Sequence, residues 1–401
     1  MADETVSVRV VGPLEEYAAS FAENLRRQGY RENTVRSHLH LVAHLSRWLD
    51  GQARGVGMLT GVEVNQFLKV RQQAGHGSLR SARGLMPLLN HLRGLGVVPE
   101  SPPPLKRAVD ALLDRYRGYL VQERGLAALT ITSYERVARK FLRERLAGDD
   151  LDLSGLSAAE VTQFVLAESQ CHSAASAKCW VTGLRSLLQF LYLDGQTPPL
   201  MGAVPAVASW RGNYLPRALD AAQVIRLLDS CDLKTTVGQR DLAILTLLVR
   251  LGLRGGEVAA LQLDDFDWRR GEVIIRGKGD RQERLPLPVD VGEVVSAYLV
   301  NARPTIECRH LFLRVLAPSG GITVDTVKSA VREACRRAGI HRVGPHRLRH
   351  TAATDMLRAG ASLSEVGQVL RHRDLATTDI YARVHRTSLR EVVRRWPGVV
   401  A

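Results

Sequence analysis

The chain has 401 residues, of which 45% are apolar and 24% charged, so it can bury sizeable cores and is not a chain disordered by composition. At roughly 100–200 residues per domain, this length predicts two to four domains. The formal net charge of +14 comes from 55 Lys and Arg against 41 Asp and Glu, and it favours a polyanionic partner, with nucleic acid as the first candidate.

Simple patterns exclude several classes of protein. The apolar stretch Leu242–Val249 is far shorter than the ~20 residues of a membrane span, and the first residues lack the regions of a signal peptide. Five scattered cysteines without CxxC spacing disfavour a disulfide framework and a thiolate zinc site. The sequence has no P-loop and no GxGxxG that opens a helix, so we expect neither ATP nor a dinucleotide cofactor. The expected location is the bacterial cytoplasm, at the nucleoid.

The first half of the chain holds two similar helical units, residues 14–99 and 105–198. The segment Leu59–Phe67 matches Leu156–Phe164, and matched positions stay 96 to 99 residues apart, which favours duplication. Thr60 and Ser157 each stand three residues before a Glu, the spacing of a helix capping box. We expect four or five short helices in each unit, which serve either as a packing scaffold or as a clamp on DNA.

Proline-rich joints punctuate the chain at Pro99–Pro104 and again between Pro198 and Pro216. Such runs favour extended linkers over helix. We therefore expect an N-terminal helical domain at 1–102, a second helical domain at 103–205, a linker at 206–212 and a larger C-terminal domain at 213–401.

The C-terminal domain mixes helices with a small sheet. Asp220 is placed to cap a helix that runs to Leu228, and Asp241–Leu251 has the pattern of an apolar helix. Glu272–Arg276 and Arg284–Leu287 have strand patterns on either side of the turn Gly277–Asp280, which predicts a hairpin. The segment 324–395 is expected to be mostly helical.

Four stretches of this domain together contain a set of cationic side chains, imidazoles and one tyrosine. Arginine forks fit phosphate oxygens, and the Pro345 position favours a helix start whose N–H groups would face an anion. A tyrosine can attack a phosphodiester as a covalent nucleophile if cations neutralise the transition state, which needs no metal. The residues with this chemistry are Arg254, Lys278, His346, Arg349, His372 and Tyr381.

These residues resemble the tyrosine recombinases, also called the phage integrase family. The Arg-x-x-Glu box corresponds to Arg254 and Glu257, and the match runs in order from about Leu215 to Val384. The chain departs from the family pattern at Arg371, where the family has Gly before the histidine, and at Gly255-Gly256, inside the arginine box.

The resemblance implies a mainly α fold, with two N-terminal helical-bundle (SAM-like) domains followed by an α+β catalytic domain that contains a small β-sheet. The second helical unit resembles the core-binding domain, which closes a clamp around DNA. The first unit resembles an added arm or a second clamp domain.

The resemblance also implies a role for each residue. Tyr381 would attack the scissile phosphate to give a 3′-phosphotyrosine and a free 5′-hydroxyl. Arg254 and Arg349 would hold the non-bridging oxygens, and Lys278 would protonate the leaving oxygen.

Four further residues would support this chemistry. His346 and His372 would assist proton transfer, Glu257 would orient its arginine, and His350 would support the site from behind. We expect no cofactor. We expect no metal either, because the arginines around the histidines would repel a cation.

The expected function is that of an integrase or transposase of a mobile element. Alternatives are Xer-type resolution of chromosome or plasmid dimers, a non-catalytic sequence-specific DNA-binding protein, and a type IB topoisomerase. The expected partners are double-stranded DNA, other copies of the chain in a tetramer on two DNA duplexes, and other recombinases or accessory factors. The helical pattern Ser388–Trp396 in the C-terminal tail would either pack on its own domain or join the tetramer.

Overall fold

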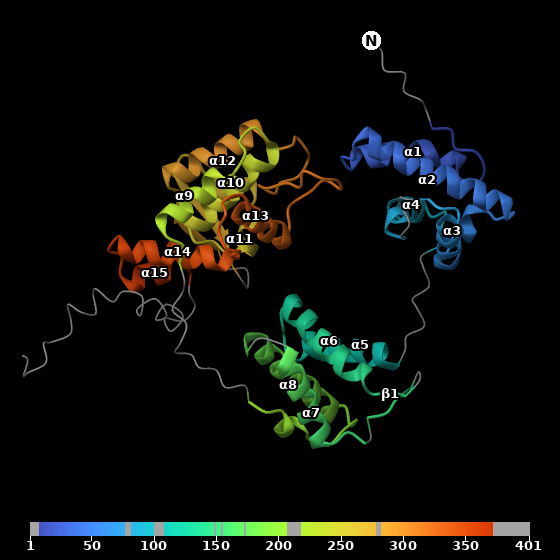
Figure 1. The fold of residues 1–401 in the computed structure, drawn as a ribbon, viewed down its shortest axis with the longest axis horizontal. Coiled ribbons are helices and arrows are strands. Elements are labelled where there is room, and N and C mark those ends of the chain that lie inside the picture. The colour runs from blue at the N-terminus through green and yellow to red at the C-terminus, as the bar shows by residue number, and fades with distance from the viewer. Residues whose placement is uncertain are drawn as a thin grey trace, which may run out of the picture. The chain divides into compact units, whose positions relative to one another are not determined.

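The computed structural model describes residues 8–76, 82–99, 108–147, 150–153, 155–171, 174–206, 218–277 and 282–371. The chain divides into two compact units, Met1–Val98 with Tyr214–Ala401, and Pro99–Asn213. Most described residues are helical (Figure 1), and a small three-stranded sheet is present. The predicted mainly α fold class is therefore confirmed, whereas the domain boundaries stay a prediction. None of the described helices is long and apolar enough to cross a membrane.

The first bundle consists of four α-helices and one 3-10 turn, Val56–Met58. The α-helices are α1 (Glu15–Arg27), α2 (Glu32–Gly51), α3 (Gly61–Gln73) and α4 (Ala82–Gly94). Gly29 joins α1 to α2 with a φ of 81°, a left-handed conformation that glycine adopts at little cost. Apolar residues at helical spacing fill the core, among them Phe21, Leu25, Leu41, Leu45, Leu88 and Leu92.

The second bundle repeats this plan. Its helices are α5 (Ala108–Gln122), α6 (Ala128–Arg143), α7 (Ala158–Cys171) and α8 (Ala174–Leu193), and a 3-10 turn follows at Met201–Ala203. Two short paired strands, β1 (Leu146–Ala147) and β2 (Asp150–Leu151), lie between α6 and α7. α6 packs against both α5 and α8 around a core that includes Tyr116, Phe141, Val161, Leu187 and Leu191.

The two predicted capping boxes are both present. The Thr60 hydroxyl accepts from the Val62 N–H at 3.2 Å, and Glu63 Oε2 accepts from the Thr60 N–H at 3.2 Å. In the second bundle, the Glu160 N–H donates to the Ser157 hydroxyl at 3.3 Å, and Glu160 Oε2 accepts from the Ser157 N–H at 2.8 Å. The same side-chain signal therefore starts α3 and α7.

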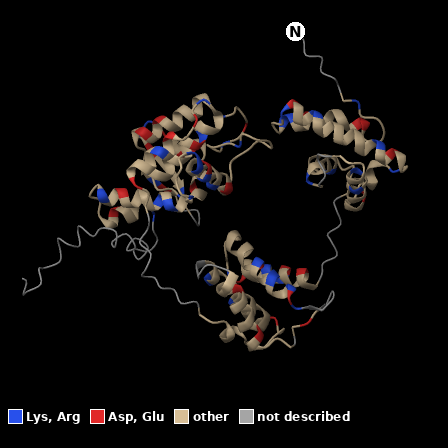
Figure 2. Cartoon of the chain, in the orientation of Figure 1, with Lys and Arg blue, Asp and Glu red and all other residues tan. Residues whose placement is uncertain are grey.

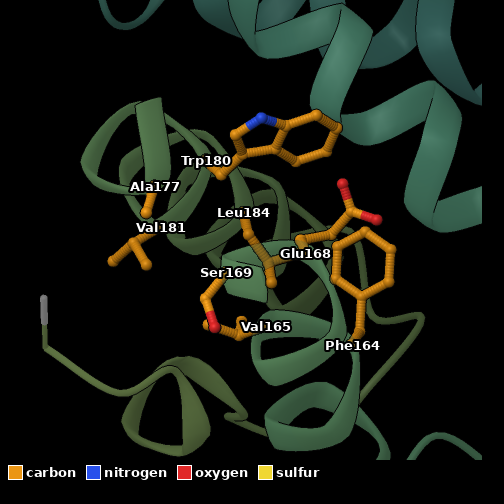
Figure 3. A pocket seen from close by; sticks show the side chains of 8 residues that line it. All are labelled: Phe164, Val165, Glu168, Ser169, Ala177, Trp180, Val181 and Leu184. Carbon is orange, nitrogen blue, oxygen red and sulfur yellow. The ribbon is translucent and has the colours of Figure 1, made fainter. Parts of the chain in front are cut away.

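A small pocket lies between α7 and α8 (Figure 3). Apart from Glu168 and Ser169 its lining is apolar, and its volume of about 20 Å³ is close to the room that one water needs. Lys140 pairs with Glu168 at 2.5 Å and lies 5.3 Å from the centre of the Trp180 ring. This pocket is a packing defect beside a salt bridge and is too small for a ligand.

The C-terminal region is built around α10 (Thr236–Arg250), which packs on several helices (Figure 1). The other helices are α9 (Ala221–Asp229), α11 (Gly255–Ala260), α12 (Val289–Asn301), α13 (Val324–Arg337), α14 (Pro345–Arg358) and α15 (Leu363–Val369), with a 3-10 turn at Leu263–Asp265. Asp220 caps α9 with a capping box, as predicted. Ala353, Leu357, Val366 and Leu370 join α14 to α15 in a small apolar cluster.

The sheet is antiparallel, in the order β3 (Phe266–Asp267), β4 (Glu272–Arg276) and β5 (Gln282–Pro286). Arg276 pairs with Gln282, so residues 277–281 connect the two strands of the predicted hairpin. β4 coincides with the predicted strand, β5 begins two residues before the predicted one, and β3 was not predicted.

The apolar helix begins five residues earlier than the predicted Asp241. The Thr235 hydroxyl accepts from the Gly238 N–H at 3.0 Å and starts α10 at Thr236. Asp241 is buried and pairs with Arg240 at 2.7 Å, so it lies inside the helix and is not its cap. The prediction relied on apolar periodicity and missed this polar first turn.

Candidate functional site

Arg254 is the N-cap residue of α11, where Glu257 holds it at two points. Its backbone N–H donates to Glu257 Oε2 at 2.8 Å, and its Nη1 donates to Glu257 Oε1 at 2.5 Å. Its Nη2 donates to the carbonyl of Arg371 at 3.3 Å. The Arg254 side chain is still 46% exposed, so its guanidinium is oriented and accessible.

Glu257 is the anion of this site, and its side chain is only 5% exposed. Burial raises the pKa of its carboxyl, but the charge of Arg371 and the N–H groups and charge of Arg254 outweigh burial and lower the pKa below its usual value. The carboxylate is therefore charged at neutral pH and is placed to hold the Arg254 guanidinium.

Arg349 lies one turn inside α14 and is 2% exposed. Its Nη1 donates to the Gly252 carbonyl at 2.6 Å, and its Nη2 donates to the Leu370 carbonyl. These bonds use two of the five N–H groups of a guanidinium. Arg349 thereby joins the segment before α11 to the end of α15.

Gly252 makes this close approach feasible. Its φ is 58°, and a Cβ there would lie 2.5 Å from Leu370 Cδ2 and 3.4 Å from Ala352 Cβ. A larger residue would be strained at this φ and would force the end of the Leu370 side chain to move.

His346 and His350 lie one turn apart on α14, with ring centres 4.4 Å apart. Although His346 is at the surface, partial burial of its ring and the charges of Arg349 and Arg254 lower its pKa. Burial, His346 and the nearby arginines lower the pKa of His350 to about 4. Both rings are therefore neutral at pH 7, and each can accept one hydrogen bond and donate another.

Arg371, at the end of α15, is a member of this cluster that the sequence analysis noted only as a departure from the family pattern. Its Nη2 donates to Glu257 Oε2 at 2.7 Å, and its side chain is 4% exposed. The charge of Glu283, in β5, also acts on Arg371, with an effect on its pKa that opposes that of burial. The signal in the sequence was an arginine where the family has glycine before the histidine.

The structure thus brings together five of the eight expected site residues: Arg254, Glu257, His346, Arg349 and His350. The other three, Lys278, His372 and Tyr381, lie outside the described residues. Among the residues that the structure describes, no group of three or more His, Cys, Asp or Glu side chains is placed to hold a metal ion.

A second charged feature lies on the second bundle. Figure 2 shows Lys and Arg positions gathered along the α5–α6 pair. On α6 the exposed or half-exposed cations are Arg136, Arg139, Lys140 and Arg143, which line one shallow surface. Asp110 pairs with Arg139 at 2.5 Å, and Glu168 pairs with Lys140 at 2.5 Å, so part of this charge is compensated within the bundle.

Known proteins resemble the chain along most of its length. The model of the phage integrase family matches residues 217–387, and that of the phage integrase N-terminal SAM-like domain matches residues 113–195. The Sinorhizobium fredii protein y4rA, classed by name with integrases and recombinases, is 39% identical over 99% of this chain and 98% of its own length.

Two Xer proteins also match. The tyrosine recombinase XerD of Listeria monocytogenes is 32% identical over 71% of this chain and 98% of its own length. The structure of the XerH site-specific recombinase bound to its difH substrate after cleavage shares the fold, with a TM-score of 0.54 at 20% identity, over 82% of this chain and 93% of that one. The chain therefore belongs to the phage integrase family, the tyrosine recombinases, which are enzymes that cleave and rejoin DNA.

Proposed function

We propose that the chain is a site-specific DNA recombinase, the integrase or transposase of a mobile element, and that it cuts DNA through a 3′-phosphotyrosine intermediate. The observation that carries this proposal is the meeting of Arg254, His346 and Arg349 at the N-terminal ends of α11 and α14. One accessible guanidinium, one buried guanidinium and a neutral imidazole suit a phosphate in its transition state.

The proposed cleavage step balances without a cofactor. A bond forms between Tyr381 Oη and phosphorus while the bond from phosphorus to the 5′-oxygen breaks. The phenolic proton of Tyr381 passes to an imidazole of the site, that of His346 or His372. Lys278 gives a proton to that leaving oxygen. The phosphotyrosine keeps the energy of the broken linkage, so a 5′-hydroxyl can rejoin the strand without ATP.

The remaining residues take the roles that the resemblance implied. Arg254 and Arg349 hold the non-bridging oxygens, and His346 acts as a neutral hydrogen-bonding partner because its pKa is lowered. His372 assists in proton transfer. Glu257 orients Arg254, and His350 packs against His346 and supports its ring.

The domain plan is part of the same proposal. An N-terminal helical domain (1–102) precedes a core-binding domain (103–205), a linker (206–212) and the catalytic domain (213–401). Double-stranded DNA at the nucleoid is bound by the core-binding and catalytic domains, and the basic face of α6 supports contact with its backbone. Four copies assemble on two duplexes through the tail after Val384, and other recombinases or accessory factors join them.

A role in a mobile element is favoured over dimer resolution by the first bundle. XerD matches 98% of its own length with only 71% of this chain, and the family models begin at residue 113. The protein y4rA, by contrast, spans 99% of the chain. Xer-type resolution is the second candidate, because nearly the whole of XerD has a counterpart here.

A covalent-trapping assay tests the catalytic proposal. Labelled fragments from both flanks of this protein's own gene, each with a nick near a candidate site, are incubated with wild type, Tyr381→Phe and Tyr192→Phe. Tyr192 is exposed on the second bundle, so it is the matched control. We expect a denaturation-resistant protein–DNA adduct with wild type and Tyr192→Phe and none with Tyr381→Phe.

Other results would change the proposal. Sequence-specific binding without an adduct would favour a non-catalytic DNA-binding protein. Adducts on distant chromosomal sites and not on the gene's flanks would favour Xer-type resolution. For the tetramer, removal of the residues after Val384 should leave DNA binding and abolish assembly, and unchanged assembly would refute the tail's role.

A further inference from the structure

Arg371 ends α15 in a conformation that arginine rarely adopts. Its φ is 55°, in the left-handed region, and its N–H donates to the Gln368 carbonyl at 2.9 Å to close the helix. Glycine at this position would end the helix without the steric cost of about 1 kcal/mol that a side chain adds. Termination of α15 therefore does not explain why the residue is arginine.

The side chain of Arg371 is directed inward. It is 4% exposed, its Nη1 donates to the Val369 carbonyl at 2.9 Å, and its Nη2 donates to Glu257 Oε2 at 2.7 Å. A buried guanidinium is costly unless it is paired, and Glu257 supplies the pairing charge across 114 residues of sequence.

Glu257 is therefore shared by two arginines. Its Oε1 accepts from Arg254 Nη1, and its Oε2 accepts from both the Arg254 backbone N–H and Arg371 Nη2. The carbonyl of Arg371 in turn accepts from Arg254 Nη2 at 3.3 Å. Arg371 thus touches the orienting carboxylate with its side chain and Arg254 with its backbone.

We propose that Arg371 is a positioning residue for catalysis: its buried pair with Glu257 fixes the guanidinium of Arg254. This inference rests on the proposed function, in which Arg254 contacts the scissile phosphate and Tyr381 attacks it.

The charge balance gives the proposal a measurable consequence. The groups that act on Glu257 are Arg254 of α11 and Arg371 beyond α15, and Glu283 of β5 and Arg254 act on Arg371. With both arginines present, one carboxylate faces two cations and a net positive charge remains for a phosphate. Without Arg371, the charge of Glu257 would neutralise that of Arg254. The pKa of Glu257 would rise, because the charge of Arg371 would no longer counteract the effect of burial.

The test compares Arg371→Gly, which suits the left-handed backbone, with Arg371→Met, which keeps an unbranched side chain without the charge, and with Arg371→Lys, which keeps the charge. The measurements are the single-turnover rate of adduct formation between pH 4 and 9 and the affinity for the same DNA. We expect both neutral variants to cleave at least about tenfold more slowly with DNA affinity unchanged, the loss expected for one hydrogen bond to a charged group.

The pH profile separates positioning from folding. A raised Glu257 pKa means that the carboxylate takes up its proton at a higher pH, so the acid limb of the rate profile should move to higher pH in both neutral variants. Arg371→Lys should restore that limb and part of the rate. Arg358→Ala, which removes only an exposed pair with Asp355 on α14, is the control and should match wild type.

Two results would overturn the proposal: an acid limb that stays in place in both neutral variants, or a rate loss that only follows a loss of DNA binding. Failure of the underlying function is distinct, because wild type would then form no adduct, or Tyr381→Phe would still form one.

Discussion

The two helical bundles share the same pattern of buried apolar positions. The N-cap residues of α2 and α6 have the same backbone geometry: Arg31 has φ −68° and ψ 148°, and Ala127 has φ −68° and ψ 146°. At an offset of 96 residues, Leu41 corresponds to Val137 and Leu45 to Phe141, and all four are buried. The apolar spacing has been kept while the side chains changed, so it is the spacing that specifies this fold.

The exposed faces of the same two helices differ. Where α6 has Arg136, Lys140 and Arg143, α2 has His40, His44 and Arg47. Two of three fixed cations are thus replaced by imidazoles, one of which, His44, has its pKa lowered by burial and nearby cations. The comparison teaches that one fold can keep its core and change how strongly its surface attracts a polyanion.

The largest expected effect tests the shared core. Leu45→Ala and Phe141→Ala each remove a fully buried side chain at corresponding positions, and each should cost about 3–5 kcal/mol. Hydrogen exchange followed by mass spectrometry should show loss of protection confined to the bundle that carries the change. If either variant caused loss of protection in both bundles, the two cores would unfold together. That result would contradict the conclusion that each bundle has its own core.

The next effect tests the different surfaces. Arg136→Ala with Arg143→Ala should weaken DNA binding about tenfold or more and lower the slope of log K against log salt by about two, since each phosphate contact contributes about one. The matched pair His40→Ala with Arg47→Ala removes one fixed cation and should lower the slope by at most about one. Salt titrations of DNA affinity measure both slopes, and equal slopes would contradict the difference in function.

The helices were predictable because their signals are local. Periodic apolar residues, the capping boxes at Thr60 and Ser157 and the Pro345 helix start all act within one or two turns, and the structure has each of them. The hairpin strands were predictable for the same reason. The predicted start of α10 was wrong, because the polar first turn after Thr235 has no apolar stripe.

The site was predictable only as a set of residue types. Arg254 and Glu257 are three residues apart, so their pairing follows from helix geometry. The pair between Arg371 and Glu257 joins residues 114 positions apart and depends on how α15 packs against α14 and Gly252. Such a contact has no local signal, and sequence reasoning could note only that an arginine stands where glycine is usual.

A smaller effect concerns pH. Burial is the main cause that lowers the pKa values of His38, His44 and His91 in the first bundle. The second bundle has a single histidine, His172, outside the described residues. At a pH near 6.5, the usual pKa of histidine, these rings bind fewer protons in the folded state than in the unfolded state. The first bundle should therefore lose stability as pH falls below about 6.5. Hydrogen exchange at pH 7.5 and 5.5, corrected for intrinsic rates, should show a larger loss of protection in the first bundle than in the second, and equal losses in the two bundles would contradict this.

The smallest expected effect tests whether the two capping boxes stabilise the two bundles equally. Thr60→Ala and Ser157→Ala each remove the hydroxyl that accepts from the first turn of α3 or α7, and each should cost about 1 kcal/mol. Thr132→Ala is the control, because that hydroxyl bonds only back to the Ala128 carbonyl within α6 and its loss should be nearly neutral. Exchange of the amides at the starts of α3 and α7 measures the effect. Because the same interaction starts both helices, the two costs should agree within a factor of about two, and a cost at one cap alone would mean that the bundles keep the motif but no longer depend on it equally.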